Sequence, residues 1–240
     1  MVNFIGTNNN AIYLKVLNEL LNNPVSKFDI GDVSHEIIGF NTWFYATGTI
    51  DGISKTYAEN EINWYMSQDN NIKGHKGIET NTVWNNCASD EGYVNSNYGW
   101  CVLSKENGNQ LEHVLEHFKS NHKTRQSIMV YTRPSIHTEA FDNIHAKYDM
   151  TCTCYVDYLI RDNKLYSLVH MRSNDVWYGL RYDLIWQQRM LNEVYTRLAS
   201  EPNFENLVLG GIKWHADSLH LYEKSIPSVI QYISDQSIRK

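Results

Sequence analysis

The stretch TCTCYVDYLIRDNKLYSLVHMRSNDVWYGLRYDLIWQQ, Thr151–Gln188, combines two strand patterns, a tight turn and the start of a helix. Tyr155–Arg161 and Lys164–Arg172 are rich in aromatic and β-branched residues, and Asp162-Asn163 between them is typical of a turn. We therefore expect a β-hairpin, followed by an apolar helix over Leu184–Leu198.

Residues that could bind a substrate or take part in catalysis lie within the same stretch. Cys152 is a candidate nucleophile, because a thiolate needs positive charge nearby and Arg172 lies on the adjoining strand of the hairpin. Arg172–Asp175 (RSND) are polar groups of the kind that hold a phosphate, and Asp183 stands at the head of the next helix. Inert buried thiols are the alternative for Cys152 and Cys154, and an N-cap role is the alternative for Asp183. These residues alone indicate a nucleophilic-thiol enzyme that acts on a small anion.

The rest of the chain mixes helix and strand patterns without a strict alternation, which favours an α+β fold in a single domain, residues 1–240. Helices are expected over Asn10–Asn22, Tyr57–Gln68, Gln110–Lys119 and Pro227–Ser234. Strands are expected over Glu36–Phe40, Ser127–Thr132, Asn206–Ile212 and Leu219–Tyr222. Loops are expected over Lys27–Gly39, Gly92–Cys101 and Ser135–Tyr148, with a turn at Asp217-Ser218.

Composition excludes several classes of partner. The 240 residues carry a net charge of −6 and no basic run, which argues against direct nucleic acid or anionic membrane binding. No apolar run approaches the roughly 20 residues of a membrane span, and the N-terminus lacks a signal-peptide pattern. Four scattered cysteines are too few for a secreted disulfide framework, so we expect a reducing cytoplasm.

Glu61 is a second candidate catalytic residue. In a helix over Tyr57–Gln68 it shares a face with Tyr57, Trp64 and Tyr65. Burial against such aromatic rings raises the pKa of a carboxyl group, which suits general acid–base work.

Two histidine patterns raise the question of a metal. His113-Val-Leu-Glu116-His117 matches the H-x-x-E-H spacing of one zinc-peptidase class, but short motifs match by chance and a solvated helix face is the preferred interpretation. His215 and His220 lie in WHADSLHLY, where hydroxyl recognition by His220 and Tyr222 is the preferred interpretation. We expect no metal.

A series of motifs in fixed order is more specific than any of these residues. The motifs are Asn95–Trp100 (NSNYGW), Arg125, Ile128–Ser135 (IMVYTRPS), Met150–Thr153 (MTCT), Tyr158–Asp162 (YLIRD), Met171–Asp175 (MRSND) and Ser218–Tyr222 (SLHLY). In this order the chain resembles the thymidylate synthase superfamily from about Lys27 to Tyr222. The RSND and YTRPS motifs resemble those of its phage-type deoxycytidylate (dCMP) 5-hydroxymethyltransferase branch.

The resemblance implies a fold, a reaction and a role for each matching residue. It implies a mixed β-sheet layered with helices, packed sheet to sheet in a homodimer, and transfer of a one-carbon unit from 5,10-methylenetetrahydrofolate to C5 of dCMP. It implies that Cys152 is the nucleophile and that Glu61 is the general acid–base group. The implied phosphate ligands are Arg172, Ser173, Lys27 and Arg125, the last from the partner subunit. His220 and Tyr222 would bind the sugar, Asp175 would lie on the folate side, and Tyr98 and Asn174 would line the rest of the pocket.

Asp183 matches the position that reads the base. Uracil-using members of the family have an asparagine there, whose amide pairs with O4 and N3–H. Cytosine offers an amino donor at C4, which a carboxylate accepts. The chain departs from the family at Gln126, where a second phosphate arginine is usual.

Several alternatives stay open at this level. A dCMP 5-methyltransferase, which would finish with hydride instead of water, and a CMP 5-hydroxymethylase would share these residues. A nucleotide-binding protein that keeps the fold without catalysis is the alternative from another class. The phage-type resemblance further implies a phage-infected bacterial cytoplasm.

Overall fold

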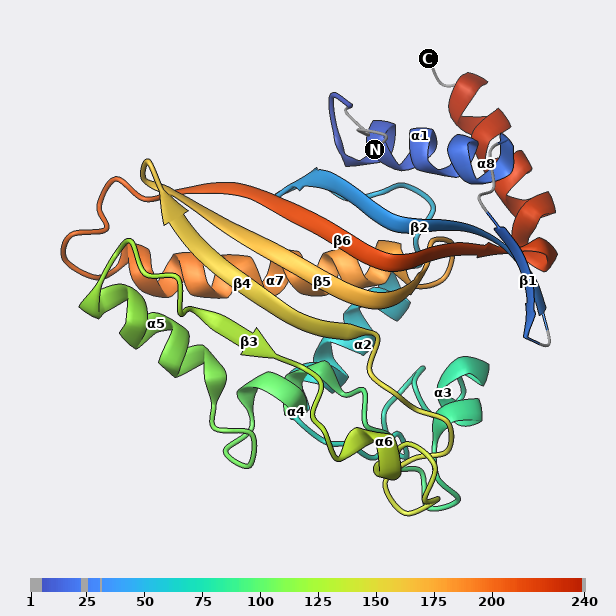
Figure 1. Ribbon diagram of the computed structural model, residues 1–240, viewed down its shortest axis with the longest axis horizontal. Helices are drawn as coiled ribbons and strands as arrows, with labels where there is room; N and C mark the ends of the chain where they lie inside the picture. Colours follow the sequence, from blue (N-terminus) through green and yellow to red (C-terminus); the bar gives the residue numbers. More distant parts are fainter. Residues whose placement is uncertain (1–5, 23–25, 31, 239–240) are drawn as a thin grey trace. The chain divides into compact units, whose positions relative to one another are not determined.

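The computed structural model describes residues 6–22, 26–30 and 32–238, with the backbone alone for 26–30 and 32. The chain divides into two compact units, Met1–Ile53 with Arg161–Lys240, and Ser54–Ile160. Both units mix helices with strands, so the expected α+β class is confirmed, while the single domain stays a prediction (Figure 1). No helix among the described residues is long and apolar enough to cross a membrane.

The first unit is built on four strands in the order β1-β2-β6-β5. Its elements are α1 (Asn9–Asn22), β1 (Ser26–Ile30), β2 (Asp32–Tyr45), β5 (Lys164–Asp175), α7 (Leu180–Ala199), β6 (Val208–Tyr222), a 3-10 turn η1 (Glu223–Ser225) and α8 (Ile226–Ile238). Strand β2 pairs antiparallel with β1 and β6, whereas β5 and β6 are parallel because α7 carries the chain back between them.

Helix α7 covers one face of this sheet (Figure 1). Val169 and Met171 of β5, and Trp214 and Ala216 of β6, are buried. Since side chains alternate between the faces of a strand, His170 and His215 point to the opposite face, where they are partly exposed. This alternation separates an apolar core face from a face that carries polar and aromatic side chains.

The second unit is mainly helical. Its elements are α2 (Lys55–Ser67), α3 (Thr82–Cys87), α4 (Tyr98–Leu103), α5 (Gln110–Ser120), β3 (Ile128–Val130), α6 (Ile136–Glu139) and β4 (Thr153–Arg161). Strands β3 and β4 pair antiparallel, and α4 contacts α2, α5 and β3. Aromatic rings fill the contact between α2 and α4, where Tyr65 stacks on Tyr98 with centroids 5.2 Å apart. This stacking places α2, the helix of Glu61, against the segment that begins with Tyr98.

The expected hairpin strands and the helices α1, α2, α5 and α8 are confirmed within a few residues, but four expectations are wrong. Asp217-Ser218 is no turn: β6 runs unbroken over Val208–Tyr222, because β2 and β5 pair with it on both sides and satisfy its backbone groups. The expected loop Lys27–Gly39 forms strands β1 and β2 instead. The loops Gly92–Cys101 and Ser135–Tyr148 contain the start of α4 and all of α6.

Candidate active site

The predicted site residues fall in both units, and each group is described in its own unit. Arg172, Ser173, Asn174, Asp175, Asp183, His220 and Tyr222 belong to the first unit, and Glu61, Tyr98, Arg125 and Cys152 belong to the second.

Asp183 lies inside α7 and not at its cap. The helix begins at Leu180 with Gly179 as its N-cap residue, so Asp183 is in the first turn and donates its backbone N–H to Gly179 O at 3.0 Å. The expected helix start at Leu184 is therefore one turn too late, and the N-cap alternative for Asp183 is wrong. Its carboxyl group serves something other than capping.

A short chain of hydrogen bonds holds that carboxyl. Asn174 Nδ2 donates to Asp183 Oδ2 at 2.8 Å, and Trp214 Nε1 donates to Asn174 Oδ1 at 3.2 Å. Asn174 and Trp214 are buried. Because the indole N–H occupies the amide oxygen of Asn174, the amide NH₂ must face Asp183. We call Asn174, Asp183 and Trp214 the Asp183 network; it orients one carboxyl oxygen by two buried side chains.

The pKa of Asp183 is raised from 3.8 to about 6, mainly because burial removes hydration from the carboxylate. The hydrogen bond from Asn174 opposes this shift, and the nearby charge of Asp175 adds to it. A carboxyl group poised in this way can be ionised or protonated close to neutral pH. It can therefore accept a hydrogen bond from an amino group and, when protonated, also donate one to a ring nitrogen.

Asp175 ends β5 in a turn that leads into α7. Its Oδ1 accepts from the backbone N–H groups of Trp177 at 2.7 Å and Tyr178 at 3.2 Å. Burial raises the pKa of Asp175 in spite of these hydrogen bonds. The carboxyl group is thus fixed through one oxygen beside the paired position His220 of β6.

His220 is buried, and its Nδ1 has no hydrogen-bond partner in the part of the chain that the structure describes. Burial lowers the pKa of His220, with the charge of Arg172 acting in the same direction and that of Asp175 opposing it. The ring meets Tyr222 edge to face, with centroids 5.1 Å apart. A neutral imidazole with an unpartnered buried nitrogen is suited to a ligand hydroxyl, because an unmade buried hydrogen bond costs about 1–3 kcal/mol.

Arg172 and Ser173 lie next to each other near the end of β5, and both are partly exposed. Ser173 pairs in register with Ser218 of β6, whose hydroxyl donates to Glu36 Oε1 at 2.5 Å. Within the first unit, the positive charge of Arg172 acts on His220 and lowers its pKa.

Cys152 lies immediately before β4, in a segment held by a buried carboxylate that the sequence did not reveal. Asp149 Oδ2 accepts from the backbone N–H groups of Asn95 at 2.6 Å and Ser96 at 2.8 Å, and its Oδ1 accepts from Ser96 Oγ at 2.6 Å. We call Asn95, Ser96 and Asp149 the Asp149 cluster. No local pattern predicts it, because Asp149 lies more than 50 residues after Asn95 and Ser96 in the chain.

Two of the other cysteines are poor nucleophiles. Burial raises the pKa values of Cys87 and Cys101 to about 12, and their thiols donate to the carbonyl oxygens of Val83 and Asn95. Cys152 is partly exposed and precedes β4, whereas Cys154 lies inside β4. Among these cysteines, Cys152 occupies the one position outside a regular element.

Glu61 is buried on α2, as expected, together with Trp64 and Tyr65. Tyr57 Oη donates to Glu61 Oε1 at 2.7 Å, and Trp84 Nε1 donates to Tyr57 Oη at 3.0 Å. Trp84 comes from α3, a helix that the sequence analysis missed. This chain of two hydrogen bonds orients the carboxyl group from one turn away on its own helix.

The remaining predicted residues differ in their surroundings. Tyr98 is buried, and its hydroxyl accepts from the backbone N–H of Thr153, next to Cys152, at 3.4 Å. Arg125 is exposed in the loop before β3. The backbone of Lys27 lies in β1, but its side chain lies outside the described part of the chain.

The H-x-x-E-H pattern on α5 does not bring its two imidazoles onto a common ligand. His117 Nδ1 bonds to Gln126 O at 2.8 Å, and His113 lies 3.7 Å from Glu116 at an exposed position. Over residues 6–22 and 33–238, the side chains that gather into a three-ligand group are instead His170, His215 and Asp217.

The sequence matches the thymidylate synthase family over residues 48–239, and the chain belongs to this family. The resemblance expected from the motif order is thereby confirmed.

The relatives divide into two groups. Deoxycytidylate 5-hydroxymethyltransferases of the enterobacteria phages T4 and T2 are each 37% identical over 190 residues, which cover 79% of this chain and 76% of theirs. A thymidylate synthase of Francisella philomiragia is 22% identical, and the match covers 94% of this chain and 85% of that protein. The chain is thus more similar to the phage enzymes in sequence, and it matches the synthase over more of its length.

Proposed function

We propose that the chain is a deoxycytidylate 5-hydroxymethyltransferase. In this reaction dCMP, 5,10-methylenetetrahydrofolate and water give 5-hydroxymethyl-dCMP and tetrahydrofolate. The folate, when bound, supplies the one-carbon unit at the oxidation level of formaldehyde, so no hydride moves and no dihydrofolate forms. The similarity to phage enzymes of this name supports the proposal.

Cys152 is the proposed nucleophile. Its thiolate adds to C6 of the cytosine ring, which makes C5 electron-rich enough to form the new carbon–carbon bond. The C5 proton is then removed as the bond between the new carbon and the folate nitrogen breaks, which leaves an exocyclic methylene group at C5 and tetrahydrofolate. Water adds to that methylene carbon, and the thiolate is expelled from C6. The protonated thiols of Cys87 and Cys101 are unsuited to this step.

Glu61 is the proposed acid–base group. A carboxyl group buried among aromatic rings and oriented by Tyr57 can exchange protons with the base and with water without losing its position. Tyr57 and Trp84 position Glu61 in this proposal and touch no substrate.

The single observation that carries the choice of base is the Asp183 network. An amide at this position would complement O4 and N3–H of uracil. The carboxyl of Asp183, with Oδ2 engaged by Asn174, accepts the C4 amino group of cytosine, and its raised pKa also makes a hydrogen bond to N3 accessible.

The nucleotide's phosphate and sugar are assigned to the ends of β5 and β6. Arg172 and Ser173 suit phosphate oxygens, with Arg125 of a second subunit and Lys27 adding charge. His220 Nδ1 and Tyr222 suit the sugar hydroxyl, since Nδ1 needs a partner. We propose a homodimer on this basis, with reaction in the cytoplasm of a phage-infected bacterium.

The residues present fit a folate. Pterin rings carry amide and amine donors, which pair with carboxylates. The Asp175 carboxyl group is held through Oδ1 by two backbone N–H groups, which keeps its second oxygen for such donors.

The test is release of tritium from C5. Protein is incubated with 5-tritiated dCMP, dUMP or CMP and methylenetetrahydrofolate, and dihydrofolate is followed in parallel. Release from dCMP alone, without dihydrofolate, is the expected result. Cys154→Ser is the matched control, since it removes a neighbouring thiol and should retain activity.

Each other outcome points to one alternative. Dihydrofolate formed in step with product indicates a dCMP methyltransferase, and release from CMP indicates a ribonucleotide enzyme. Release from dUMP indicates a synthase, and no release from any nucleotide indicates a binding protein.

A further inference from the structure

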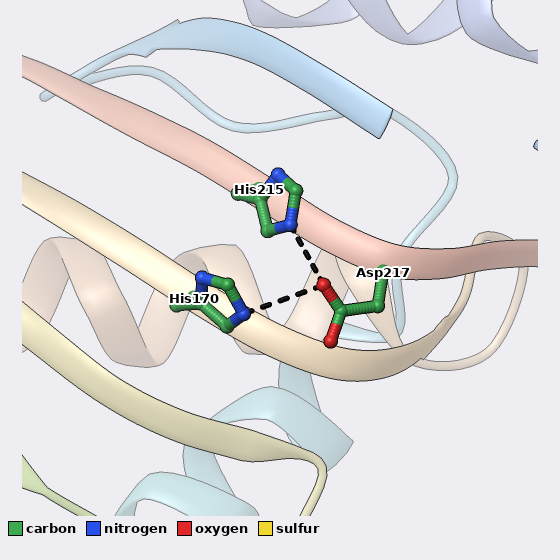
Figure 2. Close-up of side chains that lie close together, drawn as sticks. All are labelled: His170, His215 and Asp217. Carbon is green, nitrogen blue, oxygen red and sulfur yellow. Dashed lines mark hydrogen bonds and ion pairs between the residues drawn. The ribbon is translucent and has the colours of Figure 1, made fainter. Parts of the chain in front are cut away.

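On the face of the first unit's sheet opposite α7, two imidazoles and a carboxylate converge (Figure 2). His170 comes from β5, and His215 and Asp217 come from β6; His170 and His215 are paired in register. Asp217 Oδ1 lies 2.8 Å from His215 Nε2 and 3.4 Å from His170 Nε2. The three ligand atoms all lie within 4.8 Å of one another.

The orientation of His215 is determined by Asn41 of β2. Asn41 Nδ2 donates to Gly39 O at 3.0 Å, which directs Asn41 Oδ1 towards His215 Nδ1 at 3.2 Å. An amide oxygen only accepts, so Nδ1 must carry the hydrogen. In the neutral imidazole, Nε2 then presents a lone pair to a carboxylate oxygen 2.8 Å away. Two acceptors at this distance repel each other unless a proton or a metal cation lies with them.

We propose that His170, His215 and Asp217 bind one Zn²⁺ ion. Zn²⁺ bonds of about 2.1 Å place neighbouring donor atoms about 3.4 Å apart, so small side-chain rotations suffice to reach that geometry. The Nδ1–H donated to Asn41 is the outer contact that metal-binding histidines usually make. Two imidazoles and one carboxylate leave the fourth position of a tetrahedron to water.

The donor set selects the class of metal. Imidazole nitrogen suits Zn²⁺ and its transition-metal neighbours, whereas Mg²⁺ prefers oxygen donors. Among Mn²⁺, Fe²⁺ and Zn²⁺, the same donors bind Zn²⁺ most tightly. None of the three ligands has a role in the proposed reaction. The ion would tie β5 to β6 through side chains, in addition to the backbone hydrogen bonds between these strands.

The experiment measures Zn²⁺ binding to full-length protein after treatment with a chelator. A competing zinc indicator gives affinity and stoichiometry, Co²⁺ reports tetrahedral coordination by its visible absorption, and melting temperature is followed with and without Zn²⁺. We expect one Zn²⁺ per chain, a raised Tm, and no competition from excess Mg²⁺.

The variants are His170→Gln and His215→Gln, with His145→Gln as the matched control. His145 also contacts a carboxylate, Asp142, at 2.7 Å, but is no part of the cluster. Each cluster variant should weaken Zn²⁺ binding about 100-fold or more, and Asn41→Leu about 10-fold to 100-fold. The control should bind as the wild type does. All are checked for folding by circular dichroism.

Three results would overturn the proposal. They are no stoichiometric Zn²⁺ in the wild type, equal binding by wild type and both cluster variants, and binding that is lost in His113→Gln but kept in His170→Gln. The last would assign the metal to the H-x-x-E-H pattern on α5. None depends on whether the chain acts on dCMP, so the outcome is independent of the proposed function.

Discussion

The Asp149 cluster and the Asp183 network both contain a carboxyl group largely withdrawn from water, yet they treat it in opposite ways. Asp149 accepts three hydrogen bonds, two of them from backbone N–H groups. Asp183 accepts one side-chain hydrogen bond, from Asn174, and its pKa is raised to about 6. The first carboxyl group is satisfied by its own chain, while the second is not.

We expect this difference to separate a structural role for Asp149 from the proposed recognition role of Asp183. A carboxylate with all its partners inside the protein stabilises the fold and has little left to offer a ligand. A carboxyl group that loses hydration without full compensation keeps the capacity to bind one. The four predictions below test this division, from the largest expected effect to the smallest.

Cys152→Ser tests the candidate nucleophile, which follows the segment that the Asp149 cluster holds. A serine hydroxyl is a far weaker nucleophile than a thiolate, so tritium release from dCMP should fall by at least about 10⁴-fold. The free energy of unfolding should stay within about 0.5 kcal/mol of the wild type, because Cys152 is partly exposed. Activity retained at a tenth of the wild-type level would remove Cys152 from the mechanism.

Asp183→Asn tests recognition directly. The ratio of kcat/KM for dCMP to that for dUMP should fall on the order of 10³-fold, because the amide complements uracil and mismatches cytosine. Tritium release from both nucleotides measures this ratio, with Glu193→Gln, at a partly exposed position of the same helix, as a control. An unchanged ratio would contradict the role given to Asp183.

Alanine substitutions compare the two carboxyl groups in stability. Asp149→Ala leaves two backbone N–H groups and a hydroxyl without an acceptor in a buried place and should cost about 3 kcal/mol. Asp183→Ala leaves only the Asn174 amide and removes a poorly solvated charge, so it should cost about 1 kcal/mol. Urea unfolding measures the free energy of unfolding of both variants. Equal losses of stability would contradict the difference between the two carboxyl groups.

The pH dependence of stability gives the smallest effect. The pKa of Asp183 rises from 3.8 to about 6 on folding, so the folded state binds this proton more tightly than the unfolded state. Stability from this group is fully present below pH 3.8 and is lost as pH rises towards 6. The difference in unfolding free energy, wild type minus Asp183→Asn, should fall by about 1–2 kcal/mol between pH 4 and 7. A difference that does not change with pH would show that folding does not raise the pKa of Asp183.

Local patterns predicted much of the fold. The hairpin around Asp162-Asn163 was predictable because both turn residues tolerate the left-handed backbone that they adopt, with φ of 51° and 59°. Helix α5 was predictable because Leu111, Val114, Leu115 and Phe118 form one apolar face. The failure at Asp217-Ser218 has a physical cause: two neighbouring strands outweigh the turn preference of two residues.

For the site, too, the sequence predicted features that depend on local spacing and missed contacts between distant elements. Glu61 was expected against aromatic residues because helical spacing places them on one face, and α2 confirms this. The partners Trp84 and Tyr57 were not expected to act together, since a separate helix supplies the tryptophan. Asn174 was expected in the pocket, but its bond to Trp214, 40 residues later, has no trace in local spacing.

By itself, the sequence determined the family of the protein, the α+β class and the hairpin that follows Cys152, because these depend on residue types and short spacings. Tertiary structure alone decided that Asp149 is satisfied and Asp183 is not, and that His170 meets His215 and Asp217. Hydrogen-bond satisfaction depends on which distant groups the strand register and helix packing bring within about 3 Å, and no local pattern contains that information.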